Sequence, residues 1–281
     1  MDEHARQAPA VALRPYVASY VGYRQRGVPP AVHRGLPSPF LTLIFTLDEP
    51  LTMAAHPDSA QAPGSFQTLL GGLHTSPALV VHQGAQSGVQ ISLKPLGTRA
   101  LLGLPAGELA QIDVPADAVL GPAGRRIHAR LGDAAGWPQR FAVLDEELTR
   151  LLSGSAAPPP EVDHAWGLLL GSGGTMPVSE LAGRTGWSTR HLANRFREEI
   201  GLTPKAAARV VRFGRARQRL VRAAPGTLAD LAAACGYFDQ AHLAREFRAL
   251  AGCPPSQWLA EEFANIQAGA WLTGESSFYD S

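Results

Sequence analysis

The feature that most constrains this chain is a unit that occurs twice near its C-terminal end. The first copy occupies residues 178–204 and the second residues 228–255. The matching positions are Leu181-Ala182 with Leu231-Ala232, Gly186-Trp187 with Gly236-Tyr237, His191-Leu192 with His242-Leu243, Phe196-Arg197 with Phe247-Arg248, and Pro204 with Pro255. The second copy has one extra residue in its turn, between Gly236 and Phe247. Two copies are too few for a solenoid, so each copy is expected to be a unit with its own role.

Each copy has the pattern of a short helix, a turn and a second helix. The first helices are predicted at 180–185 and 229–235, and each ends at a glycine that suits the positive φ found after helices. Ser188 or Thr189 is the expected N-cap of the second helix in the first copy, and Asp239 in the second copy. The second helices are expected to bury Leu192, Phe196 and Ile200 in one copy and Leu243, Phe247 and Leu250 in the other. This layout is typical of a helix-turn-helix, whose second helix enters the DNA major groove.

The predicted outer faces of the second helices carry side chains that read DNA bases. They are Arg190, Asn194, Arg195 and Arg197 in the first copy and Gln240, Arg245 and Arg248 in the second. Arginine pairs with guanine, and asparagine or glutamine with adenine, by bidentate hydrogen bonds. A single polar face of this kind could equally be an ordinary solvated helix surface or a surface that binds DNA. Two matched copies favour DNA recognition.

At these residues the chain resembles the AraC/XylS family of bacterial transcription regulators, over residues 161–262. The family signature stands in the second copy as Ala232, Cys235-Gly236-Tyr237, Asp239, His242-Leu243, Arg245, Phe247, Gly252 and Pro255. Ala241 departs from it, because many members have Ser or another polar residue there, and Ala193 likewise offers no polar group. The DNA-contacting positions expected on this basis are Thr189, Arg190, Asn194, Arg197, Gln240, Ala241, His242, Arg245 and Arg248.

The resemblance also implies partners and a setting. The expected partners are double-stranded operator or promoter DNA, RNA polymerase, a small-molecule effector and a second copy of the chain. The chain is expected to be cytoplasmic, with no membrane partner, because residues 1–15 are polar and interrupted by prolines and no apolar run reaches the length of a membrane span.

Between the two copies, a helix is predicted at 204–221, starting with Thr203 as cap and Pro204 in its first turn. One face carries a basic stripe of Lys205, Arg209, Arg212, Arg215, Arg219 and Arg222. Val210, Phe213 and Leu220 fall on the opposite side, where they can pack against both units. The stripe is expected to contact phosphate, to pair with acids at its innermost members, or to be only solvated.

The charge distribution separates two halves of the chain. With 281 residues, two domains are expected. Residues 1–152 hold twelve Lys/Arg and twelve Asp/Glu, whereas residues 176–255 hold thirteen and six, a balance of +7. A basic excess confined to the repeated region is typical of a DNA-binding domain. The expected division is a sensor or dimerisation domain at 1–152, a linker at 153–160, a DNA-binding domain at 161–265 and a tail at 266–281.

The N-terminal half is predicted to be an antiparallel β-rich domain with helices, so the whole chain is α+β. Strands are expected at 39–47, 68–73, 78–82 and 89–96, a strand or helix at 17–23, and helices at 97–102, 105–109, 125–131 and 139–152. The apolar stripe of the last helix indicates packing within the domain or across a dimer. A further helix is expected at 164–170, with Trp166 and Leu169 or Leu170 facing the core of the DNA-binding domain.

This half looks like the uncharacterised sensor-type domain that precedes some AraC-type DNA-binding regions, on residues 37–47 and 93–108. The resemblance implies a cupin-like barrel. The metal-binding motif of enzymatic cupins is absent from the sequence, and no cofactor or metal is expected. His33, His56, His74 and His82 are ligand candidates only through their closeness to strands. Cys235 and Cys253 are expected to be small core residues, although a disulfide between them is an alternative.

Three functions compete. A transcription regulator with two helix-turn-helix units is the leading hypothesis. The second is a DNA-acting repair protein with a catalytic N-terminal domain on the same reading head, which would need a nucleophilic cysteine that residues 1–152 lack. No G-x-S-x-G motif supports a hydrolase, and the expectation is that the chain is not an enzyme. An interaction protein that no longer binds DNA is disfavoured by the basic recognition faces.

Overall fold

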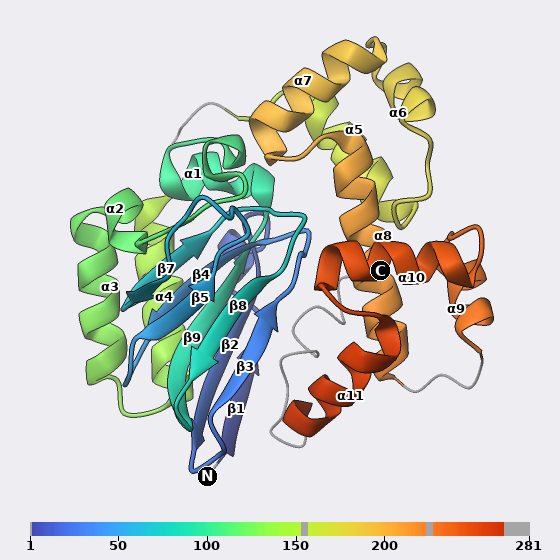
Figure 1. Cartoon of the computed structure of the whole chain (residues 1–281). Coiled ribbons are helices and arrows are strands. Elements are labelled where there is room, and N and C mark those ends of the chain that lie inside the picture. Colours follow the sequence, from blue (N-terminus) through green and yellow to red (C-terminus); the bar gives the residue numbers. More distant parts are fainter. Residues whose placement is uncertain (1, 153–156, 223–226, 267–281) are drawn as a thin grey trace.

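We describe the chain from a computed structural model, which covers residues 2–152, 157–222 and 227–266. A β-rich N-terminal region is followed by a purely helical C-terminal region (Figure 1). The predicted α+β fold, with antiparallel strands first and two helix-turn-helix units after them, is confirmed.

Two antiparallel sheets form the N-terminal region. The larger has the order β1-β2-β9-β4-β7-β10 and the smaller the order β3-β8-β5-β6. Their strands are β1 (Asp2–Gln7), β2 (Val17–Arg26), β3 (Ala31–Gly35), β4 (Leu41–Thr46), β5 (Leu51–Ala55), β6 (Gly64–Phe66), β7 (Thr68–Gly71), β8 (Ala78–His82), β9 (Ala85–Leu93) and β10 (Asp113–Val114). β4 and β9 are central in the larger sheet, and their pairing places Leu43 opposite Ile91 in a fully buried layer.

Short helices close this region. They are the 3-10 helices η1 (Val11–Leu13), η2 (Pro95–Gly97) and η3 (Ala106–Leu109), and the α-helices α1 (Thr98–Leu102), α2 (Ala116–Leu120), α3 (Pro122–Asp133) and α4 (Trp137–Leu151). α3 and α4 lie on the side away from the helical region (Figure 1). α4 packs onto β2, where the rings of Phe141 and Tyr20 stack at 6.0 Å and the Tyr20 hydroxyl donates to Asp145 at 3.0 Å. The apolar stripe of α4 is therefore used within the domain.

The strands differ from the sequence prediction mainly at their limits. The segment 17–23 is a strand and extends to Arg26, and the strand expected at 89–96 begins at Ala85 and stops at Leu93. It stops there because Pro95 begins η2, and proline has no backbone N–H for the ladder. The unpredicted strands β1, β3, β5, β6 and β10 are short or lie at edges, where polar residues obscure the alternation.

Seven helices make up the described part of the C-terminal region. They are α5 (Pro160–Gly171), α6 (Val178–Thr185), α7 (Thr189–Ile200), α8 (Pro204–Val221), α9 (Leu228–Ala234), α10 (Gln240–Ala251) and α11 (Pro255–Ile266). The bounds of α8 are those predicted, whereas α5 begins at Pro160, within the expected linker and ahead of the expected start at residue 164. Residues 153–156 of that linker and residues 267–281 of the expected tail lie outside the described part.

α8 runs through the middle of the helical region, with α5, α6 and α7 on one side and α9, α10 and α11 on the other (Figure 1). In the first unit, the Trp166 ring packs on Phe196 at 5.9 Å. In the second, Phe247 lies between Phe213 of α8 at 4.9 Å and Trp258 of α11 at 5.6 Å. Of the two candidates, Leu169 faces the core, since Leu170 is only half-buried. The core is thus built around the aromatic positions that the repeat shares.

Both cysteines are buried and free, as the core interpretation predicts. Burial raises the pKa of the Cys235 and Cys253 thiols, so they are poor nucleophiles. Among the described helices, none is both long and apolar enough to cross a membrane.

Candidate nucleic-acid interface

The first helix-turn-helix consists of α6, a turn and α7. Gly186 ends α6 with φ of 71°, and the N–H of Trp187 donates to the Ala182 carbonyl at 3.1 Å. Ser188 is the N-cap of α7, since its hydroxyl accepts from the His191 N–H at 3.2 Å. This resolves the choice between Ser188 and Thr189, and it leaves the Thr189 side chain exposed on the first turn of the helix.

The second helix-turn-helix repeats this design in α9, a turn and α10. Thr227 and Asp230 form a capping box at the start of α9. Gly236 has φ of 75°, and the N–H of Tyr237 donates to the Ala232 carbonyl at 2.9 Å. Asp239 caps α10 by accepting from the His242 N–H at 2.6 Å. Both turns are therefore fixed by local hydrogen bonds, and both present the first turn of the second helix to solvent.

The predicted contact residues lie on the exposed faces of α7 and α10. Those exposed to solvent are Thr189, Arg190, Asn194, Arg197, Gln240, Ala241, Arg245 and Arg248, while His242 is half-buried. Arg195, which the sequence places on the same face, is instead half-buried and paired with Glu198 at 2.5 Å. The pair leaves Arg195 less available for DNA than Arg190 or Arg197.

His242 has a fixed orientation at the start of α10. Its ring meets the Tyr237 ring edge-on at 5.3 Å, and its Nδ1 accepts from the Phe238 N–H at 3.3 Å. An Nδ1 that accepts carries no proton, so the neutral ring holds its proton on Nε2. Nε2–H is thus the donor that His242 offers to a phosphate or base oxygen.

The basic stripe of α8 divides into structural and exposed members. Arg209 pairs with Glu246 of α10 at 2.7 Å, and Arg212 donates to the Gly174 carbonyl at 2.8 Å while lying over the Tyr237 ring. Arg215 packs over Gly173, where a Cβ would lie 1.7 Å from its Nη1. Lys205, Arg219 and Arg222 are exposed. The prediction that the innermost arginines pair with acids is confirmed for Arg209.

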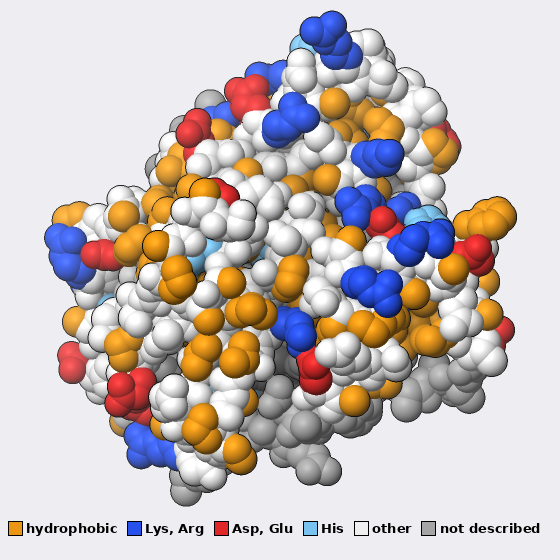
Figure 2. All heavy atoms as spheres, in the orientation of Figure 1, with side chains coloured by type: hydrophobic (Ala, Val, Ile, Leu, Met, Phe, Trp, Pro, Cys, Tyr) orange, Lys and Arg blue, Asp and Glu red, His pale blue; other side chains and the backbone are white. Residues whose placement is uncertain are grey.

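These contacts fix the two units relative to each other. Arg212 joins the loop before α6 to the turn of the second unit, and a Cβ at Gly236 would lie 2.5 Å from Cγ2 of Thr175 in that loop. Lys and Arg side chains gather on the face of the helical region seen in Figure 2. The region therefore presents a basic surface to which α7 and α10, the candidate recognition helices, contribute (Figure 2).

The N-terminal region touches the C-terminal ends of both recognition helices. At α7, Arg99 of α1 donates from Nε and Nη2 to the two carboxylate oxygens of buried Glu199, each at 2.8 Å. A Cβ at Gly107 would lie 2.2 Å from the Glu198 carbonyl oxygen, so η3 packs directly on this end. At α10 and α11 the contacts are Pro77 beside Gly252 and an ion pair between Arg34 and Glu261.

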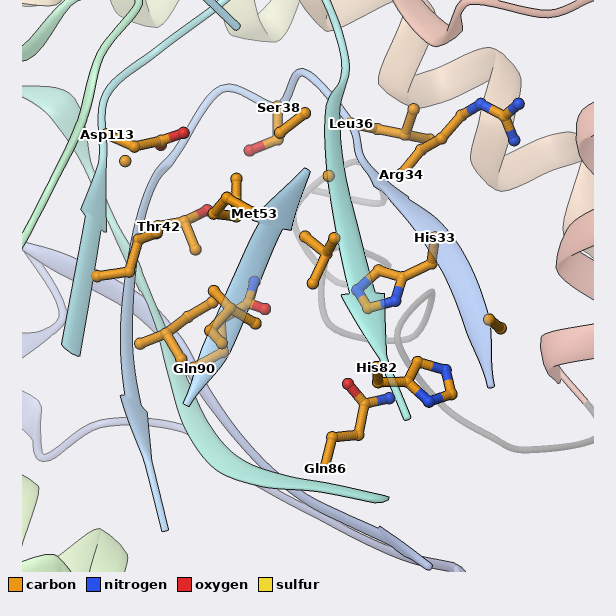
Figure 3. A pocket seen from close by; sticks show the side chains of 18 of the residues that line it. His33, Arg34, Leu36, Ser38, Thr42, Met53, His82, Gln86, Gln90 and Asp113 are labelled. Atoms are coloured by element: carbon orange, nitrogen blue, oxygen red, sulfur yellow. The ribbon is translucent and has the colours of Figure 1, made fainter. Parts of the chain in front are cut away.

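A cavity of about 400 Å³ lies between the two sheets and opens toward the helical region. Its apolar wall is formed by Ile44, Leu51, Met53, Leu69 and Val80, and its polar groups include Thr42, Gln86 and Gln90 (Figure 3). Two lining residues come from the helical region, Arg217 of α8 and Trp258 of α11. The indole Nε1 of Trp258 is buried and has no hydrogen-bond partner among the described residues. Trp258 therefore belongs to the wall of the cavity, and its Nε1 is covered by neighbouring protein atoms.

Three of the four candidate histidines line this cavity, namely His33, His74 and His82. Burial, and to a lesser extent the neighbouring His82, lowers the pKa of His33 to about 4. Burial also lowers the pKa of His74 and of His82. The fourth candidate, His56, is instead bonded through Nδ1 to Asp113 at 2.7 Å. No group of three or more metal-binding side chains occurs in the part of the chain that the structure covers.

Comparison with known proteins finds two families. Residues 162–261 match the family described as a helix-turn-helix domain, and residues 5–115 match a domain of unknown function. They support the two resemblances noted in the sequence, to a helix-turn-helix region of the AraC type and to an uncharacterised N-terminal domain. None of the curated protein sequences matches this chain.

Solved structures resemble the chain as well. The apo form of a single-substitution variant of ToxT from Vibrio cholerae strain SCE256 has a TM-score of 0.52 and 9% identity, over 86% of this chain and 97% of that one. A probable AraC family regulator from Rhodopseudomonas palustris CGA009 has 28% identity and a TM-score of 0.33, over 37% of this chain and 97% of that one. An AraC-type regulator from Chromobacterium violaceum has 23% identity and a TM-score of 0.33, over 36% and 91%.

Proposed function

We propose that this chain, a DNA-binding transcription regulator with a helix-turn-helix region of the AraC type, reads two successive major-groove segments of one duplex and responds to a small amphipathic effector. The observation that carries the proposal is the pair of recognition helices α7 and α10, held by α8 in one rigid body with their arginine, asparagine and glutamine side chains exposed. Arg190 and Asn194 read one segment, and Gln240 and Arg245 read the next.

The charge of the region supports this assignment. Residues 176–255 hold thirteen Lys/Arg and six Asp/Glu, and exposed Lys205, Arg219 and Arg222 extend the basic surface beyond the recognition helices. Phosphate contacts by such residues position the protein, and the recognition helices then supply base specificity. Successive major-groove segments on one face of B-DNA lie roughly 34 Å apart. One chain with two reading heads can occupy both.

The cavity supports the effector. About 400 Å³ is enough for a small molecule, and the apolar wall with a few polar groups suits an amphipathic one. A buried donor without a partner costs free energy. Trp258 Nε1 is covered by protein atoms, so a ligand oxygen would bond to it after a shift of the indole ring or its neighbours and would then remove that cost. The effector is therefore expected to carry a carbonyl, carboxylate or ether oxygen at the end that faces α11.

A ligand bound in the cavity can affect the second helix-turn-helix unit through side chains that pack against one another. Trp258 packs against Phe247, a fully buried residue of α10. A ligand shifts the arrangement of α10 only by the difference between its affinities for the two arrangements. The N-terminal region in this proposal senses and does no chemistry. Pairing of two chains would raise the affinity for DNA, because the two chains would bind the duplex as one linked unit. RNA polymerase is the protein partner that a promoter-bound regulator would meet.

Selection of bound DNA from a random pool by the purified full chain tests the first half of the proposal. We expect a motif with two conserved blocks and an affinity that falls steeply with salt. A thermal-shift screen of amphipathic molecules with oxygen acceptors tests the second half. Trp258→Phe removes the indole donor and should weaken the stabilisation by a hit, whereas Trp166→Phe, a buried tryptophan outside the cavity, should not. A protein that selects no motif would contradict the proposal.

A further inference from the structure

The two helix-turn-helix units differ by one residue, and the structure identifies it. Trp187 and Tyr237 correspond, because each N–H donates to a carbonyl five residues earlier and each ring meets a histidine edge-on. The first unit passes directly from Trp187 to its N-cap Ser188, whereas the second inserts Phe238 between Tyr237 and its N-cap Asp239. Phe238 is the residue that breaks the repeat.

The inserted phenylalanine is almost entirely in solvent. Phe238 is 93% exposed, more than the two other large exposed hydrophobic residues among those described, Val11 at 73% and Val32 at 55%. Both neighbours in the turn have structural tasks, since Tyr237 is buried and Asp239 caps α10. Nothing in the fold of the second unit uses the ring of Phe238. A single exposed hydrophobic residue does not by itself indicate a binding surface. The place of Phe238 in the fold is therefore what bears on its role.

Its position indicates what binds there. Phe238 directly precedes Asp239, the N-cap of α10, and Gln240 and Ala241 in the first turn of that helix are also exposed. In helix-turn-helix proteins the N-terminal residues of the recognition helix lie nearest the base edges. The backbone is held in place, because the Phe238 N–H donates to His242 Nδ1. The ring is thus presented from a fixed turn at the edge of the expected DNA surface, and not from a mobile loop.

The chemistry of the ring selects one feature of the groove. A phenyl group has no hydrogen-bond donor or acceptor, so it offers nothing to a phosphate or to a polar base edge. The 5-methyl group of thymine is the apolar feature of the major groove, and phenylalanine is among the side chains that contact it. Ala241 adds a second small apolar group at the same end of α10.

We infer that Phe238 is a DNA contact that reads the 5-methyl group of a thymine at the border of the segment bound by α10. The inference rests on the proposed function, because it requires that α10 lies in a major groove. It assigns a base preference to the second unit that the first unit lacks, since the first unit has no residue at this position.

The test uses the full chain and a duplex that it selects from a random pool. Each thymine in the block assigned to α10 is replaced in turn by deoxyuridine, which removes the methyl group and keeps the base pair. At one position we expect the wild-type affinity to fall about fourfold, the factor for one buried methyl group. Phe238→Ala should bind the original duplex more weakly by at least that factor and should not respond to the same replacement. Phe238→Leu should keep part of the response.

The possible outcomes distinguish a failure of this inference from a failure of the proposed function. If the wild-type chain selects no motif, the proposed function is wrong. If it selects a two-block motif but Phe238→Ala binds it with wild-type affinity, or responds to every deoxyuridine as the wild type does, this inference is overturned and the proposed function stands. Val11→Ala, an exposed hydrophobic residue of the N-terminal region, is the matched control and should leave DNA affinity unchanged.

Discussion

The two helix-turn-helix units, called the first and second head below, share one design but are held in different ways. The first head is tied to the N-terminal region at the end of α7, through the two hydrogen bonds from Arg99 to the buried Glu199 carboxylate. The second head is tied to α8 through Arg209 and Glu246, and to the cavity through Trp258. The repeat therefore accounts for the fold of each head, and the contacts outside the repeat account for how each one is connected.

This difference has a consequence for regulation. Under the proposed function, α10 is the element that an effector would influence most directly, because Phe247 of α10 packs on the cavity-lining Trp258. The turn of the second head also carries Phe238, which the first head lacks. We therefore expect perturbations of the two heads to differ in stability, in pH dependence and in DNA preference.

The largest expected effect is loss of an aromatic core residue from either head. Phe196→Ala and Phe247→Ala should each lower the free energy of unfolding by about 3–5 kcal/mol, because both side chains are fully buried. Phe238→Ala is the control and should change it by less than about 0.5 kcal/mol, since that ring is exposed. Denaturant unfolding measures all three. An unchanged stability in Phe247→Ala would contradict the equivalence of the two cores.

A smaller loss of stability is expected when the contacts between the N-terminal region and the two heads are removed. Among the described residues, Arg99→Ala leaves the buried Glu199 carboxylate with Arg195 at 3.9 Å as its remaining ion pair, and should cost about 1–3 kcal/mol. Arg34→Ala should cost less than about 1 kcal/mol, because its partner Glu261 has a side chain that is 40% exposed. Equal costs in the two variants, measured by thermal unfolding, would argue against a more firmly held first head.

The last expected effect is a pH dependence of the free energy of unfolding that comes from His33, which lines the cavity. Burial beside His82 lowers the pKa of His33 to about 4, and the unfolded histidine titrates near pH 6.5. The unfolded chain therefore takes up the proton first, so the stability that His33 supplies is present above pH 6.5 and is lost as the pH falls toward 4. Between pH 7.5 and 5.5 the loss should be about 1 kcal/mol.

His33→Gln should reduce that loss, and His164→Gln should not, because His164 is exposed on α5. The free energy of unfolding at a series of pH values gives the comparison. A wild-type pH dependence in His33→Gln would show that His33 does not titrate abnormally.

The helical region could be predicted closely from the sequence because its signals are local. Glycines at the turns, the caps Thr203 and Asp239 and the spacing of apolar residues define each helix within a few positions, so α8 begins and ends where expected. The N-terminal sheets depend on pairing between distant segments, such as β2 with β9, and short edge strands carry little alternation. Their existence could be predicted only in part.

The residues of the candidate site also differ in how well the sequence predicts their surroundings. The exposed faces of α7 and α10 follow from helical periodicity, so the exposure of most candidate contact residues could be predicted. Arg195, which periodicity places on the same face, is instead half-buried and paired with Glu198. The entry of Arg217 and Trp258 into a cavity of the other region is a tertiary contact between segments far apart in the chain. The repeat did contain the signal for Phe238, as an extra residue whose exposure the structure then identified.

The central claim is that one chain reads two successive segments, one with each head. The most direct measurement is selection from a random pool by the wild type and by two paired variants, Arg190→Ala with Asn194→Ala, and Gln240→Ala with Arg245→Ala. The account predicts a motif of two blocks about one helical turn apart, with each paired variant relaxing one block, at about 1–3 kcal/mol per lost bidentate contact, and preserving the other. Variants that relax the same block, or that leave the motif unaltered, would contradict it.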